Sequence, residues 1–160
     1  MTKEQQYELA RPFPSKDILW RPGSVTKAKD KCIPLAYIDA RHVMERLDDV
    51  MGTMGWTREH RIDGEFILCK LSLWSNPLGE WVSKEDGANK SDIEGVKGGL
   101  SDAFKRAAVS FGIGRYLYAV PSSWVPIDEW KKIPAPVQQK LAQAIERFST
   151  KWEADNKVGE

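Results

Sequence analysis

Lys105 and Arg106 are adjacent cations in an otherwise apolar segment with helical spacing. We expect little acidic compensation beside them, and two such cations suit an extended anionic backbone better than a small substrate. Arginine offers phosphate a rigid bidentate fork, and lysine offers a mobile point charge. The pair therefore predicts a contact with nucleic-acid phosphates. The alternative is a core helix in which Arg106 pairs with Asp102 one turn before it.

The segment that carries the pair is predicted to be a helix about 30 Å long, at about 1.5 Å per residue. A capping box formed by Ser91 and Glu94 marks its start, and Gly112 or Gly114 marks its end. The apolar side chains recur at helical spacing and should face the core. They are Leu100, Phe104, Ala107, Ala108 and Phe111. Lys97, Ser101 and Lys105 form one polar stripe.

Two glycines, Gly98 and Gly99, lie inside this predicted helix. Each costs about 0.5 to 1 kcal/mol relative to alanine. A helix that tolerates this cost often has something packed or bound close to its backbone, and we expect such a contact here.

The elements before this helix predict an α+β fold. Asp39 is a good N-cap for a helix whose apolar side chains, Val43, Met44, Leu47, Val50 and Met51, point inward. Asp63-Gly64 predicts a hairpin between a strand that begins near Trp56 and one over residues 65–74. A turn at 76–79 leads into a third strand. The order predicts a three-stranded antiparallel meander packed on the long central helix.

The two ends of the chain are less regular. We predict a short helix and an arm before Ser15, a strand from Asp17 that ends at Pro22-Gly23, a loop over 24–31 and an extended stretch over 35–38. A final amphipathic helix follows Pro134 or Pro136 and carries Val137, Leu141, Ile145, Phe148 and Trp152 on one face. We expect one domain over residues 1–155 and a flexible tail over 156–160.

Composition narrows the function classes. The 160 residues carry a formal charge of +1, from 24 basic and 23 acidic side chains, so DNA binding needs a local patch and not bulk charge.

Cys32 and Cys69 lack metal-ligand spacing, and Cys69 is expected to be buried and reduced. No phosphate-binding G-x-x-x-x-G-K-S/T loop occurs, so we expect no ATP use. We also expect no cofactor and no enzyme activity. No signal peptide or long apolar run is recognisable, so a soluble, cytoplasmic protein without a membrane partner is expected.

An ordered set of motifs covers the chain from about residue 9 to 128. Asp102, Lys105 and Arg106 precede an S-F-G step at 110–112. The others are RPFP at 11–14, WRPG at 20–23, LAYIDAR at 35–41, GW at 55–56, FGIGRYLY at 111–118 and WV at 124–125. The chain resembles the Rad52 superfamily of single-strand annealing proteins, most closely its bacterial and phage branch, which includes DNA damage response proteins of radiation-resistant bacteria.

The resemblance implies a curved three-stranded sheet on the long helix, and subunits assembled into rings or open helical arrays. It implies a groove in which Lys105 and Arg106 hold the phosphates of single-stranded DNA with the bases outward, so that a complementary strand can pair without ATP. The implied role is annealing and 3′-end protection in recombination and double-strand break repair. An exonuclease and a single-strand-binding protein are the possible protein partners.

The resemblance also implies further DNA contacts. Arg21 and Tyr37 correspond to a groove arginine and an aromatic side chain, although Tyr37 is also consistent with a core tyrosine. Arg41 lies in the first turn of its predicted helix, where a cation is electrostatically misplaced and a partner anion is favoured. The remaining candidates, each also consistent with an ordinary solvated cation, are Lys97, Arg115, Lys84 and Lys90.

One departure is that Val109 stands where the eukaryotic members have a further basic residue, which either weakens the inner site or leaves Arg115 to compensate. Two other functions remain open. The first is a double-stranded nucleic acid binder that recognises shape. The second is a metal-dependent nuclease using acids such as Asp39, Asp86, Asp92 and Glu94, of which Asp39 and Glu94 are better explained as helix caps.

Overall fold

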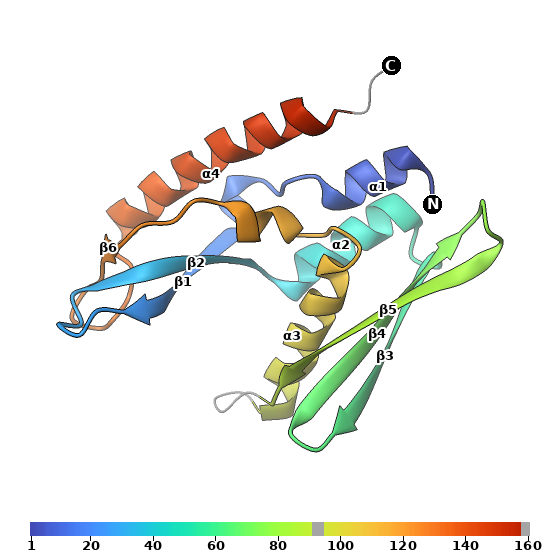
Figure 1. The fold of residues 1–160 in the computed structure, drawn as a ribbon, viewed down its shortest axis with the longest axis horizontal. Helices are drawn as coiled ribbons and strands as arrows, with labels where there is room; N and C mark the ends of the chain where they lie inside the picture. The colour runs from blue at the N-terminus through green and yellow to red at the C-terminus, as the bar shows by residue number, and fades with distance from the viewer. Residues whose placement is uncertain (91–94, 158–160) are drawn as a thin grey trace. The chain divides into compact units, whose positions relative to one another are not determined.

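The computed structural model describes residues 1–90 and 95–157, and the chain divides into two compact units. The first consists of Met1–Arg11 and Ala40–Arg115, and the second of Pro12–Asp39 and Tyr116–Lys157. The predicted capping box of Ser91 and Glu94 lies outside the described residues. Figure 1 shows the elements of each unit, which are α+β in character.

In the first unit, the predicted meander is confirmed. Strands β3 (Trp56–Asp63), β4 (Phe66–Ser75) and β5 (Glu80–Asn89) form an antiparallel sheet in the order β3-β4-β5. The Asp63-Gly64 hairpin is present: Asp63 pairs with Phe66, and Gly64 adopts the left-handed φ of 58° that such a turn requires. Side chains therefore alternate between a face covered by helix α3 (Gly95–Val109) and an open face.

Helix α3 lies very close to this sheet at Gly99. A Cβ atom at this position would meet the Cδ1 atom of Ile67 in β4 at 2.5 Å. The expectation that something packs against the backbone at the two glycines is thus confirmed at Gly99. Of the predicted core face, Phe104, Ala107, Ala108 and Phe111 are buried and Leu100 is half-buried; Ala103, which was not predicted, is buried as well.

Gly112 ends α3, as predicted. Its N–H donates to Val109 O at 2.9 Å, and the N–H of Ile113 donates to Ala108 O at 3.2 Å. With a φ of 99° at Gly112, these are the two bonds of a Schellman motif. The described helix has 15 residues and is about 22 Å long at about 1.5 Å per residue.

Helices α1 (Lys3–Ala10) and α2 (Ala40–Met51) complete the first unit. Val43 and Leu47 are buried as predicted, whereas Met44, Val50 and Met51 are only half-buried. Arg46 is buried instead, which the pattern did not predict. Its guanidinium donates to the carbonyls of Glu8, Leu9 and Arg11 at 2.6 to 3.3 Å, so that it caps the C-terminal end of α1.

The second unit contains a sheet that the sequence did not predict. Strand β1 (Ile18–Val25) pairs with β2 (Lys31–Ile38), and β2 pairs with the short β6 (Val125–Pro126). The first strand does not end at Pro22-Gly23: a register shift between Pro22 and Val25 absorbs the proline, and pairing resumes. The short 3-10 segments are η1 (Ser15–Asp17) and η2 (Arg115–Ala119).

The predicted last helix is present as α4 (Ala135–Asn156), directly after Pro134. Its Val137 and Leu141 pack on a small core built around Cys32, Ile127 and Ile133, and Ile145 is buried, while Phe148 and Trp152 are half-buried. Among residues 1–90 and 95–157, no helix has both the length and the apolarity needed to span a membrane.

Candidate nucleic-acid interface

Arg106 projects from α3 toward β5. Its Nε lies 3.2 Å from Oδ1 of Asp86, and about half of the guanidinium side chain stays exposed. Asp86 lies on the helix-facing side of β5, since it pairs in register with the buried Cys69. The arginine is therefore held at the edge of the sheet with part of its donor fork toward solvent.

Lys105 points along α3 and pairs with Asp102, with 3.1 Å between Nζ and Oδ1. The expectation of little acidic compensation beside the two cations is therefore wrong: each has a carboxylate partner. The alternative interpretation is wrong in detail as well, because Asp102 pairs with Lys105 and the partner of Arg106 comes from the neighbouring strand. Both pairs are partly exposed, so a phosphate can compete with either carboxylate.

Lys84 and Arg115 meet at the C-terminal end of α3. The Nζ of Lys84 lies 2.7 Å from the carbonyl oxygen of Ser110, and Arg115 donates to the same oxygen at 2.9 Å. The Nε of Arg115 also donates to Val109 O at 3.0 Å. These carbonyls carry the negative end of the helix dipole, which is a favourable place for cations. Both residues therefore have a structural role, because they cap the C-terminal end of α3. The side chains of both residues nevertheless remain exposed to solvent.

These four cations lie on β5, on α3 and just after α3 in the first unit, and together they are here called the basic band. Lys84 and Asp86 are two residues apart on one face of β5, and Ser110 follows Arg106 by one helical turn. The cations are Lys84, Lys105, Arg106 and Arg115, and the carboxylates among them are Asp86 and Asp102. The band thus has more positive than negative groups, which is the requirement for holding an anionic backbone.

The opposite edge of α3 carries a cation that sequence reasoning missed. The guanidinium carbon of Arg58 in β3 lies 4.4 Å from the centroid of the Phe104 ring. Arg58 lies on the helix-facing side of β3, together with Trp56 and His60, which are two residues before and after it. This spacing of two residues along a strand is the signal that could have identified Arg58 from the sequence. It remains exposed, so it extends the positive surface to the other side of the helix.

His60 ties β3 to α3 from the same edge. Its Nε2 lies 3.1 Å from the carbonyl oxygen of Leu100, to which it donates. Burial lowers the pKa of His60; the hydrogen bond opposes this change, and the charge of Arg58 adds to it. The neutral ring is therefore favoured beside the cation.

Three predicted residues of the first unit lie away from the basic band. Lys97 is exposed, two turns before Lys105 along α3. Lys90 lies at the hairpin end of the sheet, where its Nζ is 4.0 Å from a carboxylate oxygen of Glu65. Arg41 is exposed in the first turn of α2, as predicted. These residues belong to the candidate site only if a bound strand extends beyond the band.

Arg21 and Tyr37 belong to the second unit. They lie on the face of the β1-β2 hairpin opposite the one that carries Ile18, Trp20 and Ile38. The guanidinium carbon of Arg21 is 5.8 Å from the centroid of the Tyr37 ring, within the range of a cation–π contact. The structure thus brings these two candidates together as a pair within the second unit.

The cysteine thiols and the acidic side chains show whether thiol chemistry or a metal-dependent nuclease site is present. Cys32 and Cys69 are both buried and free, and burial raises the pKa of Cys69 to about 11, which makes its thiol unreactive. Within residues 1–90 and 95–157, no group of three or more His, Cys, Asp or Glu side chains is arranged to hold a metal ion. Of the acids considered for a nuclease, Asp92 and Glu94 lie outside the described residues.

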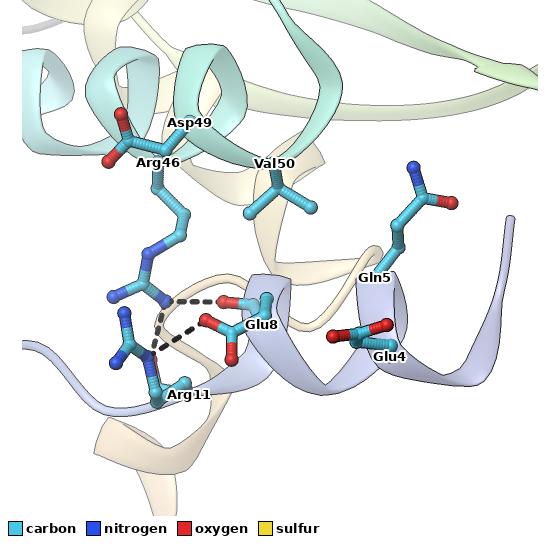
Figure 2. Close-up of a pocket in the computed structure, with 7 residues that line it drawn as sticks. All are labelled: Glu4, Gln5, Glu8, Arg11, Arg46, Asp49 and Val50. Atoms are coloured by element: carbon cyan, nitrogen blue, oxygen red, sulfur yellow. Dashed lines mark hydrogen bonds and ion pairs between the residues drawn. The ribbon is translucent and has the colours of Figure 1, made fainter.

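A pocket of the first unit lies between α1 and α2 (Figure 2). It is lined by Glu4, Gln5, Glu8, Arg11, Arg46, Asp49 and Val50. Arg11 pairs with Glu8 at 3.2 Å, and Arg46 is engaged by the backbone of α1. Carboxylates outnumber cations here, so the pocket lacks the positive excess that a phosphate site needs.

The basic band on an α3–sheet layer defines a candidate nucleic-acid-binding surface. The Rad52/22 family of double-strand break repair proteins matches residues 1–63 and 69–132, and the chain belongs to this family. It is similar to a protein of Deinococcus deserti named single-stranded DNA-binding protein DdrA, with 40% identity over 131 residues that cover 81% of this chain and 64% of the relative.

The protein of the same name from Deinococcus radiodurans is 34% identical over 131 residues, which cover 81% of this chain and 62% of that relative. The chain therefore spans less than two thirds of the length of either relative.

Proposed function

We propose that this protein binds single-stranded DNA through the basic band and pairs complementary strands during double-strand break repair. The observation that carries the proposal is that Lys84 and Arg115 meet on the carbonyl oxygen of Ser110 at the C-terminal end of α3, one helical turn after Arg106, which reaches the neighbouring strand at Asp86. Membership of a double-strand break repair family and similarity to proteins named single-stranded DNA-binding proteins support it.

The binding step is an exchange of ion-pair partners. A phosphate oxygen replaces the carboxylate of Asp86 on Arg106, and another replaces that of Asp102 on Lys105. Contacts of this kind are made to the backbone and leave the base edges free for a second strand. The exchange releases counterions and consumes no nucleotide, so annealing proceeds without ATP.

Finer parts of the proposal concern the rest of the chain. Arg21, Tyr37 and Arg41 contact the strand outside the basic band, and Lys97 and Lys90 extend its path along the first unit. The protein coats and protects 3′ ends as a homo-oligomer, in a ring or a helical array. A single-strand-binding protein and an exonuclease act on the same DNA.

The test is annealing of two complementary labelled oligonucleotides without ATP or metal. We compare the wild type with Lys105→Ala/Arg106→Ala. The matched control is Lys140→Ala/Arg147→Ala, which removes the same charges from exposed positions of α4. Wild type and control are expected to accelerate pairing, and the α3 variant is expected to lose acceleration and to bind a single strand at least about tenfold more weakly, since phosphate contacts dominate affinity.

The salt dependence of binding identifies the lost contacts. The slope of log K against log salt is about −0.7 per phosphate contact for single strands, so it should become less negative by about 1.4 in the α3 variant if both residues contact phosphates. Equal annealing by the α3 variant and the wild type would disprove the assignment of the site. A wild type that prefers duplex DNA at matched salt would instead support a shape-reading duplex binder.

A further inference from the structure

Two turns meet at one end of the second unit. The first, between β1 and β2, is closed by Thr26, whose N–H donates to Lys31 O at 3.0 Å. The second spans Asp128 to Lys132 and is closed by the N–H of Asp128, which donates to Lys132 O at 2.9 Å. The N–H of Ile127 donates to Asp30 O at 3.0 Å and holds the two turns side by side, as the path of β6 beside the hairpin in Figure 1 shows.

These turns present cations and an aromatic ring to solvent. The exposed side chains, here called the tip cluster, are Lys29, Lys31, Lys131, Lys132 and Trp130. Trp130 is 74% exposed, which is a large apolar surface to leave in water. The combination of a free aromatic face with flanking cations is the chemistry that stacks a base and holds its phosphates.

Two of the acids near the tip cluster accept hydrogen bonds within the turns. Asp30 Oδ1 accepts a hydrogen bond from Thr26 Oγ1 at 2.6 Å, and Asp128 Oδ1 accepts one from the N–H of Lys132 at 2.8 Å. Both carboxylates therefore stabilise loop conformations, and Glu129 is the remaining acid of the second turn. These hydrogen bonds leave the carboxylates charged, but the four lysines of the tip cluster outnumber the three acids, so the two turns keep a net positive charge.

Backbone geometry points to the same residues. Among the described residues, the non-glycine positions with positive φ are Lys29, at 58°, and Lys131, at 56°. Glycine or asparagine occupies this left-handed region at lower cost than lysine. Each of the two adjacent turns therefore has a lysine at a strained position. The backbone conformation alone would favour glycine at both positions.

We propose that the tip cluster is a second contact for single-stranded DNA, in which Trp130 stacks on a base and Lys29, Lys31, Lys131 and Lys132 hold the neighbouring phosphates. This inference rests on the proposed function of the basic band, and it assigns the second unit a strand contact of its own. Stacking on a base tolerates any sequence, so the contact serves a protein that binds strands regardless of sequence.

The direct test is photocrosslinking of the full chain to an oligothymidine that contains 5-iododeoxyuridine, followed by mass spectrometry of the crosslinked peptide. Crosslinking at Trp130 is expected. Trp130→Ala should lose this product and bind the oligonucleotide about 5-fold or more weakly, from the usual strength of base–aromatic stacking. The matched control is Trp81→Ala, an exposed tryptophan on the open sheet face of the first unit.

A second variant distinguishes an affinity loss caused by removing charge from one caused by unfolding. Lys29→Gly/Lys131→Gly removes two cations and relieves two strained positions, so its melting temperature should equal or exceed that of the wild type while its affinity falls. Lys140→Gln/Lys151→Gln on α4 is the charge-matched control and should keep wild-type affinity.

Wild-type affinity in both tip variants, with no crosslink at Trp130, would overturn this inference and leave the basic band intact. Wild-type affinity combined with a smaller assembly in Trp130→Ala would also overturn it, because Trp130 would then belong to a subunit contact. Failure of the wild type to bind any single strand would overturn the proposed function itself.

Discussion

Arg106 and Asp86 form an ion pair of 3.2 Å between α3 and β5, at the edge where the sheet meets solvent. The pair joins an expected phosphate ligand to a carboxylate of the same unit. In the proposed complex a phosphate oxygen replaces that carboxylate on Arg106, so Asp86 opposes the interaction between Arg106 and a phosphate. Its exposure keeps this cost small, because solvent-exposed ion pairs contribute only about 0.2–1 kcal/mol.

Asp86→Asn should therefore strengthen binding. Removing the competing charge frees Arg106, and we expect affinity for a single-stranded oligonucleotide to rise about 2- to 5-fold, corresponding to the energy of an exposed pair of up to about 1 kcal/mol. Fluorescence anisotropy at a fixed salt concentration measures the change.

The control for Asp86→Asn is Glu85→Gln, which alters net charge equally on the same strand. Glu85 lies on the opposite face of the sheet, where it pairs with Arg61 at 3.0 Å. If Glu85→Gln raises affinity as much as Asp86→Asn, net charge and not release of Arg106 explains the effect.

Gly99→Ala should loosen the contact between α3 and the sheet. The new methyl group would lie 2.5 Å from Cδ1 of the buried Ile67, so either the helix or the isoleucine must move. Overpacking of this kind costs about 1 kcal/mol or more, partly offset by the higher helix propensity of alanine. Urea unfolding measures the loss.

The double variant Gly99→Ala/Ile67→Val tests the cause, because valine lacks the Cδ1 atom that would clash. The two substitutions together should cost less than the sum of the single ones. Strict additivity would show that the methyl–methyl contact is not the origin of the loss.

Local patterns were enough to predict much of the first unit. The Asp63-Gly64 turn, the strand over residues 65–74 and the glycine at the end of α3 each depend on neighbours in the chain, and all three are confirmed. In the second unit, a strand from Asp17 and an extended stretch over 35–38 were predicted, but their pairing was not, and β6 was missed because it has two residues and its partner is distant in sequence. A pairing of this kind leaves no local periodicity.

The candidate site was predictable only in part. Lys105 and Arg106 are evident from their position on an amphipathic helix. Their carboxylate partners depend on which side chains of β5 face the helix, and on whether Asp102 turns toward one cation or the other. The capping of α3 by Lys84 and Arg115 likewise follows from tertiary packing and not from spacing.

Arg46→Ala should destabilise the first unit strongly. The buried guanidinium satisfies carbonyls at the end of α1, and Figure 2 shows it pointing from α2 toward that helix. A buried carbonyl left without a donor costs about 1–3 kcal/mol and a part-buried one costs less; one buried and two part-buried bonds are lost here, so we expect a loss of about 2 kcal/mol in the free energy of unfolding.

Glu45→Ala is the control for Arg46→Ala. Glu45 is the preceding residue of α2 and is exposed, so its loss should change stability by less than about 0.5 kcal/mol. Arg46→Lys should recover part of the loss, because an ammonium can reach some of the carbonyls but lacks the planar fork. Equal stability of the Arg46→Ala and Glu45→Ala variants would rule out a capping role for this arginine.

His60 should make the first unit less stable in acid. Its pKa lies below the ordinary value of 6.5 in the folded protein, mainly because of burial, whereas the unfolded chain keeps the ordinary value. The unfolded state therefore takes up the proton first, and stability that is present above about pH 6.5 is lost as the pH falls through the folded-state pKa.

The comparison of wild type with His60→Gln isolates this contribution, since glutamine can still donate to Leu100 O but does not titrate. Between pH 8 and pH 5 the wild type should lose more unfolding free energy than the variant, by less than about 1 kcal/mol because the ring is only half-buried. Parallel pH profiles would show that His60 takes up its proton equally in the folded and unfolded states.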